Sequence, residues 1–123
     1  PHTVAAASLT GWKNISKAEK RGEHQLYAVD WGVTLTAAAQ LHDGLCAVGV
    51  RAHDILEEER HNRYAIVCDQ PIEDPFELTQ PFTFACQGDK KMLLWVKLQR
   101  REPYSAPKEV GIAPDKVLPL YEK

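Results

Sequence analysis

Four polar side chains have the chemistry of an oxyanion site. Lys13, Asn14 and Ser16 lie close together near the start of the chain, and Arg51 follows an uncharged run at 45–50. Lysine supplies a positive charge, asparagine and serine supply neutral donors, and arginine adds a forked donor. A small dianion needs several such donors more than a full counter-charge. The pattern predicts an oxyanion site; the alternative is an ordinary strand start with exposed polar side chains.

A second group has residue types that bind divalent metals. If residues 54–61 were helical, steps of four would align His53, Glu57 and His61 on one face. The alternative is a solvated acidic turn with pairing between charges. No Cys/His group in the sequence has the spacing of a structural zinc site. The metal hypothesis therefore depends on the helix.

Several catalytic motifs are absent from the sequence. It has no Gly-x-x-x-x-Gly-Lys-Ser/Thr phosphate loop, no Gly-x-Gly-x-x-Gly and no Gly-x-Ser-x-Gly. The net charge of −2 attracts neither nucleic acid nor anionic lipid, although Lys and Arg pairs flank Trp95. We therefore expect no enzymatic activity, no cofactor bound by this chain and no nucleic-acid partner.

The cysteines and the hydropathy pattern bear on the compartment. Cys46, Cys68 and Cys86 lie far apart in apolar segments, and an odd number without Cys-x-x-Cys favours reduced thiols in the cytosol. No apolar run approaches the ~20 residues that span a bilayer, and no signal-peptide pattern is present. We therefore expect a cytoplasmic protein.

Short strands would position these side chains. Apolar and polar residues alternate over 24–29, 33–36 and 92–98, and the run 45–50 predicts a strand buried on both faces. Further strands are expected at 12–19, 64–68, 76–78 and 82–86. About six to eight strands separated by turns predict a mainly β sandwich or small barrel.

Other segments depart from the β pattern. The Ala-rich stretch 3–9 predicts about two helical turns, with Thr3 or Ser8 near a cap. Prolines predict an irregular connection over 70–75 and an interruption at 80–81. The end, 112–120, predicts a single turn and a short apolar tail that docks on the barrel.

Three short motifs follow one another along the chain, and their order matters for the resemblance described next. They are Leu-Thr-Gly-Trp-Lys-Asn-Ile-Ser at 9–16, Asp-Trp-Gly at 30–32 and Val-Gly-Val-Arg-Ala-His-Asp at 48–54. Together they resemble the C-terminal regulatory (TOBE-like) region of ABC-transporter ATP-binding subunits, in the molybdate/sulfate importer group. The likeness is strong over 3–55 and looser over 64–120.

The resemblance implies a fold and a division of the chain. The fold would be a small OB-like β-barrel with a short N-terminal helix. Residues 1–12 would end the linker helix from an upstream ATPase domain, and residues 13–123 would form the barrel. The ATP and Mg²⁺ sites would then lie in the domain that precedes Pro1.

The resemblance also implies a function. The barrel would regulate an importer of an oxyanion such as molybdate or sulfate, through ligand sensing and dimerisation of the ATP-binding subunits. Its partners would be a second ATP-binding subunit and a membrane permease subunit, at the inner face of the cell membrane. Lys13, Asn14 and Ser16 would stand at the family's donor-rich position. Arg51 matches the family's strand-end arginine, which would serve either the ligand or the structure and interface of the barrel.

Two other functions remain open at this point. One is a structural dimerisation domain that binds no ligand. The other is a free-standing metal-binding β-barrel protein that uses His53, Glu57 and His61.

Overall fold

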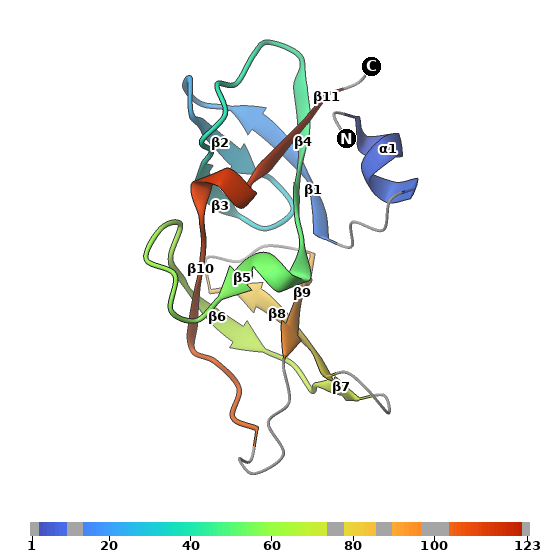
Figure 1. Ribbon diagram of the computed structural model, residues 1–123, viewed down its shortest axis with the longest axis vertical. Helices are drawn as coiled ribbons and strands as arrows, with labels where there is room; N and C mark the ends of the chain where they lie inside the picture. Colours follow the sequence, from blue (N-terminus) through green and yellow to red (C-terminus); the bar gives the residue numbers. More distant parts are fainter. Residues whose placement is uncertain (1–2, 10–13, 74–77, 86–89, 97–103, 122–123) are drawn as a thin grey trace.

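The uncharged run predicted as a buried strand forms β4 (Leu45–Val50), inside the first of two sheets (Figure 1). The structure is a computed structural model, and it describes residues 3–9, 14–73, 78–85, 90–96 and 104–121. β4 pairs antiparallel with β1 on one side and β11 on the other. Its last four residues are buried, so side chains on both faces are covered, as predicted.

The first sheet, sheet 1, has the order β11-β4-β1-β2-β3 and is antiparallel throughout. Its other strands are β1 (Asn14–Lys20), β2 (Gln25–Ala28), β3 (Val33–Thr36) and β11 (Leu118–Tyr121). β1 pairs with β4 over 14–17 but with β2 only over 18–20. The first half of β1, residues 14–17, therefore has no strand neighbour in sheet 1 on the edge opposite β4.

The second sheet, sheet 2, has the order β5-β10-β6-β8-β7, and β9 also pairs with β8. Its strands are β5 (Ile55–Leu56), β6 (Tyr64–Cys68), β7 (Ile72–Glu73), β8 (Leu78–Phe84), β9 (Met92–Val96) and β10 (Glu109–Ile112). All of its pairings are antiparallel. Sheets 1 and 2 together contain eleven strands among the described residues, more than predicted.

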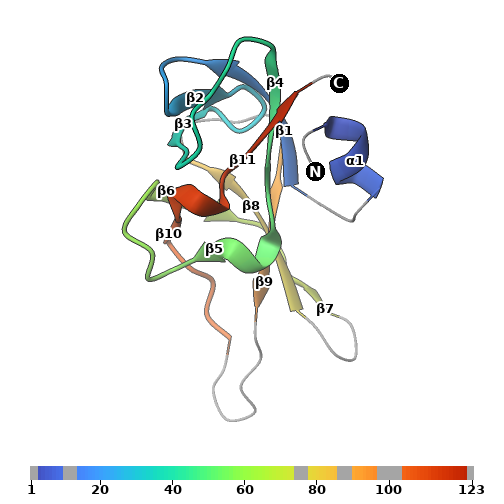
Figure 2. The same cartoon turned by 45° about the horizontal axis from the view of Figure 1, so that its top comes forward.

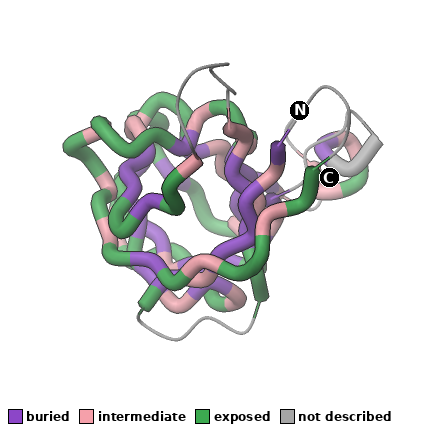
Figure 3. The backbone as a smooth tube through the Cα atoms, turned by 90° about the horizontal axis from the view of Figure 1, so that it is seen from below, coloured by how far each residue is buried: buried purple, intermediate pink, exposed green. Residues whose placement is uncertain are grey.

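The two sheets share one hydrophobic core, which makes the fold a small β-barrel. The chain crosses between them twice, through the 3₁₀ turns η1 (Ala52–Asp54) and η2 (Pro114–Lys116) (Figure 2). Leu26 and Leu35 from sheet 1 belong to the same buried cluster as Phe82 and Met92 from sheet 2. Seen from below, the backbone encircles this common interior (Figure 3). The predicted mainly β, small-barrel fold class is confirmed.

The predicted N-terminal helix is present as α1 (Val4–Leu9). The hydroxyl of Thr3 accepts a hydrogen bond from the Ala6 N–H at 3.1 Å, as expected of an N-cap. Ala7 is buried in a small cluster with Ala47 of β4 and Leu120 of β11. α1 thus covers the face of sheet 1 that points away from the main core.

The expected interruption at 80–81 is wrong, because β8 continues through Pro81. Leu93, which faces Pro81 in the register, directs its N–H and C=O to the side chain of Asn14. Pro81 and Leu93 therefore form a non-hydrogen-bonded pair between β8 and β9. A pair of this kind uses no backbone N–H, so proline is tolerated at this position. On its other edge, β8 pairs with β6 from Phe82 onward and with β7 up to Thr79, so Pro81 lies between these two pairings. The C=O of Pro81 still accepts a hydrogen bond from the Asp69 N–H.

Two further expectations are corrected by long-range pairing. The irregular connection at 70–75 contains β7, because Ile72 and Glu73 pair with β8. The C-terminal segment contains two strands, β10 and β11, around the predicted single turn, and β11 pairs with β4. The expected strand ends at Phe76 and Cys86 lie outside the described residues. Among the residues that the structure describes, no helix is long and apolar enough to cross a membrane.

Candidate functional site

Asn14, a predicted oxyanion donor, instead joins the two sheets. Its Nδ2 donates to the C=O of Leu93 at 2.8 Å, and its Oδ1 accepts from the N–H of Leu93 at 2.7 Å. The residue is only 2% exposed. The carboxamide therefore pairs with β9 as the backbone of a neighbouring strand would, on the side of β1 that β2 leaves uncovered.

Ser16 is buried in the same region and is also bonded to the backbone. Its hydroxyl donates to the C=O of Lys17 at 2.8 Å and accepts from the N–H of Asp30 at 3.0 Å. The Asp30 carboxylate in turn accepts from the N–H of Lys17 at 2.9 Å. These contacts attach the β2–β3 turn to β1.

The β9 strand is tied to this cluster at a second point. The N–H of Lys90 donates to the C=O of Asp30 at 2.9 Å, and its Nζ donates to the C=O of Ile15 at 2.8 Å. Ser16, Asp30 and Lys90 thus belong to one hydrogen-bonded network near the start of β1, and the contact of Asn14 with Leu93 is separate from it.

The other two predicted donors are placed differently. Lys13 lies outside the described residues. Asn14 of β1 faces Val50 of β4, and Arg51 is the next residue after Val50. Asn14 and Arg51 therefore lie at the same end of sheet 1. The side chain of Arg51 is exposed, whereas those of Asn14 and Ser16 are buried. An anion at Asn14 or Ser16 would have to compete with backbone groups for the hydrogen bonds that these side chains now make.

The helix over 54–61 on which the metal hypothesis depends does not form. Only Ala52–Asp54 makes a 3₁₀ turn, and Ile55 and Leu56 form β5 against β10. Ile55 is 1% exposed and belongs to the main core. Burial of Ile55 in an extended strand outweighs the helical preference of the acidic stretch after it.

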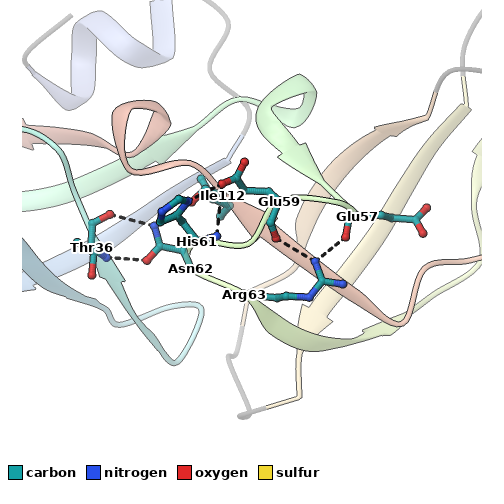
Figure 4. Close-up of polar contacts among 7 residues, drawn as sticks. All are labelled: Thr36, Glu57, Glu59, His61, Asn62, Arg63 and Ile112. Carbon is teal, nitrogen blue, oxygen red and sulfur yellow. Dashed lines mark hydrogen bonds and ion pairs between the residues drawn. The ribbon is translucent and has the colours of Figure 1, made fainter.

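Without the helix, the three candidate metal ligands do not share a face. The imidazole of His53 stacks on the indole of Trp95, with ring centroids 4.8 Å apart. The Nδ1 of His61 pairs with Oε1 of Glu59 at 2.7 Å, and the carboxylate of Glu57 points away from it (Figure 4). Within the described ranges, no group of three or more His, Cys, Asp or Glu side chains could hold a metal ion. The structure thus gives the metal hypothesis no site.

The loop between β5 and β6 contains a second connection between the sheets (Figure 4). Asn62 accepts from the Thr36 N–H at 2.7 Å through Oδ1, and its Nδ2 donates to the C=O of Thr36 at 2.9 Å. The same Nδ2 donates to the C=O of Ile112 at 2.9 Å. Asn62 has a φ of 49°, a left-handed conformation that asparagine tolerates better than most residues.

Arg63 and His61 hold this loop in shape. Arg63 Nη1 donates to the C=O of Glu57 and Glu59, and its Nε pairs with Glu109 at 2.9 Å. The hydrogen bond from His61 is the main cause that lowers the pKa of Glu59 below its ordinary value.

Asn62 was not predicted as a functional residue from the sequence. The only local signal for it is that an asparagine occurs in a polar turn.

β8 contains one buried polar side chain, that of Gln80. Gln80 is fully buried; it donates to the C=O groups of Asp69 and Pro81 and accepts from the hydroxyl of Tyr104. Burial raises the pKa of Tyr104 to about 12, with smaller contributions from Cys68 and Glu57. Burial also raises the pKa of the Cys68 thiol. These neutral groups attach the segment before β10 to the end of the barrel.

No protein-family model matches the chain, and no curated protein sequence is significantly similar to it.

Proposed function

We propose that the chain is the C-terminal regulatory barrel of an ATP-binding subunit of an ABC importer for an oxyanion. The support is the TOBE-like motif set together with a matching fold class, a small β-barrel preceded by a short helix. The observation that carries the proposal is that the motifs meet in space. Ser16 of the first motif accepts a hydrogen bond from the Asp30 N–H of the second. Asn14 of the first motif faces Val50, the residue before Arg51 in the third, so these two motifs lie at the same end of sheet 1.

Within this role, the geometry favours subunit contact over anion sensing. The donors of a sensing site would be Asn14 and Ser16, and both are engaged by backbone groups inside the barrel. A rigid barrel that offers its exposed faces to a second ATP-binding subunit requires no such donors. The barrel would then bias how the two subunits open, through different affinities for the open and closed arrangements. ATP and Mg²⁺ would bind in the ATPase domain, not in the barrel.

Reading the gene upstream of the codon for Pro1 tests the family assignment. The proposal expects an ATPase domain there, with a Gly-x-x-x-x-Gly-Lys-Ser/Thr phosphate loop in the same reading frame. An open reading frame that encodes this barrel without such a domain would remove the proposal.

Two measurements on the whole subunit separate contact from sensing. Isothermal titration with molybdate, tungstate and sulfate is expected to give no heat, and sedimentation is expected to show a dimer. Saturable binding of one of these anions that is lost in Arg51→Ala would instead support the sensor role. The matched control is Arg60→Ala, because Arg60 is another exposed arginine, distant in sequence from the motifs.

A further inference from the structure

The side of sheet 2 that points away from the core, here called the outer face, can be defined from β8. This strand has strand neighbours on both edges, β6 and β7 on one and β9 on the other (Figure 1). Phe82 and Phe84 lie in the shared core, so Thr83 between them points to the outer face. Thr79, four residues earlier on the same strand, points the same way. Residues that face these two threonines across a ladder also lie on the outer face.

Three large apolar side chains lie on the outer face. Val67 of β6 faces Thr83 in the register. Ile72 of β7 and Trp95 of β9 face Thr79 from its two sides. Val67 and Ile72 are each 59% exposed, the largest exposed fractions of any large apolar side chain that the structure describes. An apolar patch that is exposed in this way is typical of a surface that binds another molecule.

An ion pair crosses the same face. Asp69 follows β6 on one edge of β8, Lys91 precedes β9 on the other edge, and their side chains are paired. Because buried aromatic rings fill the core side of β8, this pair spans β8 on the outer side. Farther along the face, Arg63 pairs with Glu109 at 2.9 Å. The positive and negative charges of these two pairs are balanced.

This balance of charge favours a second copy of the chain as the occupant of the face. A nucleic acid or an anionic membrane is attracted by an excess of positive charge, which balanced pairs do not supply. In a contact with twofold symmetry, both copies use the same patch, so the patch must be complementary to itself. An apolar surface with one lysine and one aspartate meets this condition, because Lys91 of each copy can pair with Asp69 of the other.

We propose that two copies of the barrel contact each other through the outer face of sheet 2. This inference rests on the proposed function, in which the barrel joins two ATP-binding subunits, and it names the face that does so. The described part of the face has fewer side chains than the roughly 20–30 residues per partner of a standard interface. The contact therefore depends on the attached ATPase domains, which raise the effective concentration of one barrel near the other.

Charge reversal tests the pairing between copies. Sedimentation of the whole protein, without ATP, measures the dissociation constant of the dimer. Asp69→Lys leaves two lysines on the face and Lys91→Asp leaves two aspartates, so each variant alone is expected to dissociate at least about tenfold more readily. An equal mixture of the two variants is expected to associate as the wild type does, whereas mixing does not repair a folding defect. The matched controls, Lys20→Asp and Asp43→Lys, reverse an ion pair beside sheet 1 and are expected to leave the dimer unchanged.

A second variant tests the apolar part of the face. Val67→Lys changes a largely exposed side chain, so the variant is expected to fold, and the charge placed in the contact is expected to weaken the dimer at least about tenfold. Val29→Lys, at a 38% exposed position in the β2–β3 turn of sheet 1, is the control.

A monomeric wild type would overturn the proposal. So would outer-face variants that keep the wild-type dissociation constant, which would leave the face to a different protein, or a mixture that associates no better than either variant alone. None of these results bears on the family assignment, because that assignment is decided by the reading frame upstream of Pro1.

Discussion

Gly111 in β10 is the position where a single methyl group should disturb the barrel most clearly. A Cβ at Gly111 would lie 2.1 Å from the carbonyl oxygen of Glu59 and 2.8 Å from its carbonyl carbon. Ordinary contacts between such atoms begin near 3.5 Å, so the Glu59 backbone would have to retreat by more than about 1 Å. The requirement for glycine here is close approach, since its φ is not in the left-handed region.

The retreat would disturb the hydrogen bonds that shape the β5–β6 loop. The C=O of Glu59 accepts from Arg63 at 2.9 Å, and the C=O of His61 accepts from the Ile112 N–H at 2.9 Å. Overpacking costs about 1–3 kcal/mol, and the partial weakening of these two hydrogen bonds adds roughly 1 kcal/mol in total. We therefore expect Gly111→Ala to lower the free energy of unfolding by about 2–4 kcal/mol.

Thermal and urea unfolding measure this loss. At roughly 4 °C per kcal/mol for a chain of this size, the expected fall in Tm is about 8–16 °C. The control is Gly22→Ala, where the nearest atom to the new Cβ is 3.9 Å away and the φ is not left-handed. That variant is expected to stay within about 0.5 kcal/mol of the wild type. If Gly111→Ala melts within about 2 °C of the wild type, the close approach of Glu59 to β10 is refuted.

Two further predictions concern pH. The pKa of Tyr104 is raised by burial to about 12 from 10.0, so the neutral phenol is favoured in the folded state, and the associated stability should be lost as pH rises from about 10 to about 12. Tyr104→Phe should abolish this loss of stability at alkaline pH, although it also removes the hydrogen bond to Gln80. Urea unfolding midpoints at pH 8 and pH 11 measure the effect. If the midpoint of the variant falls between these pH values as much as that of the wild type, the prediction is contradicted. The pKa of Glu59 is lowered from 4.5 chiefly by the His61 hydrogen bond, so its contribution is present above that value and is lost as pH falls. Glu59→Gln should flatten the acid limb of the stability curve, with Glu58→Gln, an exposed neighbour, as the control.

Local sequence patterns were sufficient to predict an element wherever contacts near in sequence determine its conformation. The alternation in β2 and β3 places Leu26 and Leu35 in the core, as predicted. Thr3 caps the predicted helix through a contact three residues away. In these cases the deciding contacts are near in sequence, or the alternation itself specifies which face is buried.

The candidate site could not be predicted in the same way. Asn14 and Ser16 were predicted as donors to an oxyanion. The partner that Asn14 has in the fold could not be known from the sequence, since Leu93 is 79 positions away. The partners of Asn62 are 26 and 50 positions away. Residue type indicates that a carboxamide can bind an anion or a backbone; only the fold decides which of these is next to it.

The sequence by itself determined the mainly β character, the short helix and the buried β4 strand, because hydrophobic periodicity and capping act over a few residues. The tertiary structure alone decided that β8 continues through Pro81 and that Ile55 and Leu56 form a strand and not a helix. It also decided that the C-terminal segment contains two strands. In each of those cases, pairing with a distant strand or burial in the shared core outweighs the local preference.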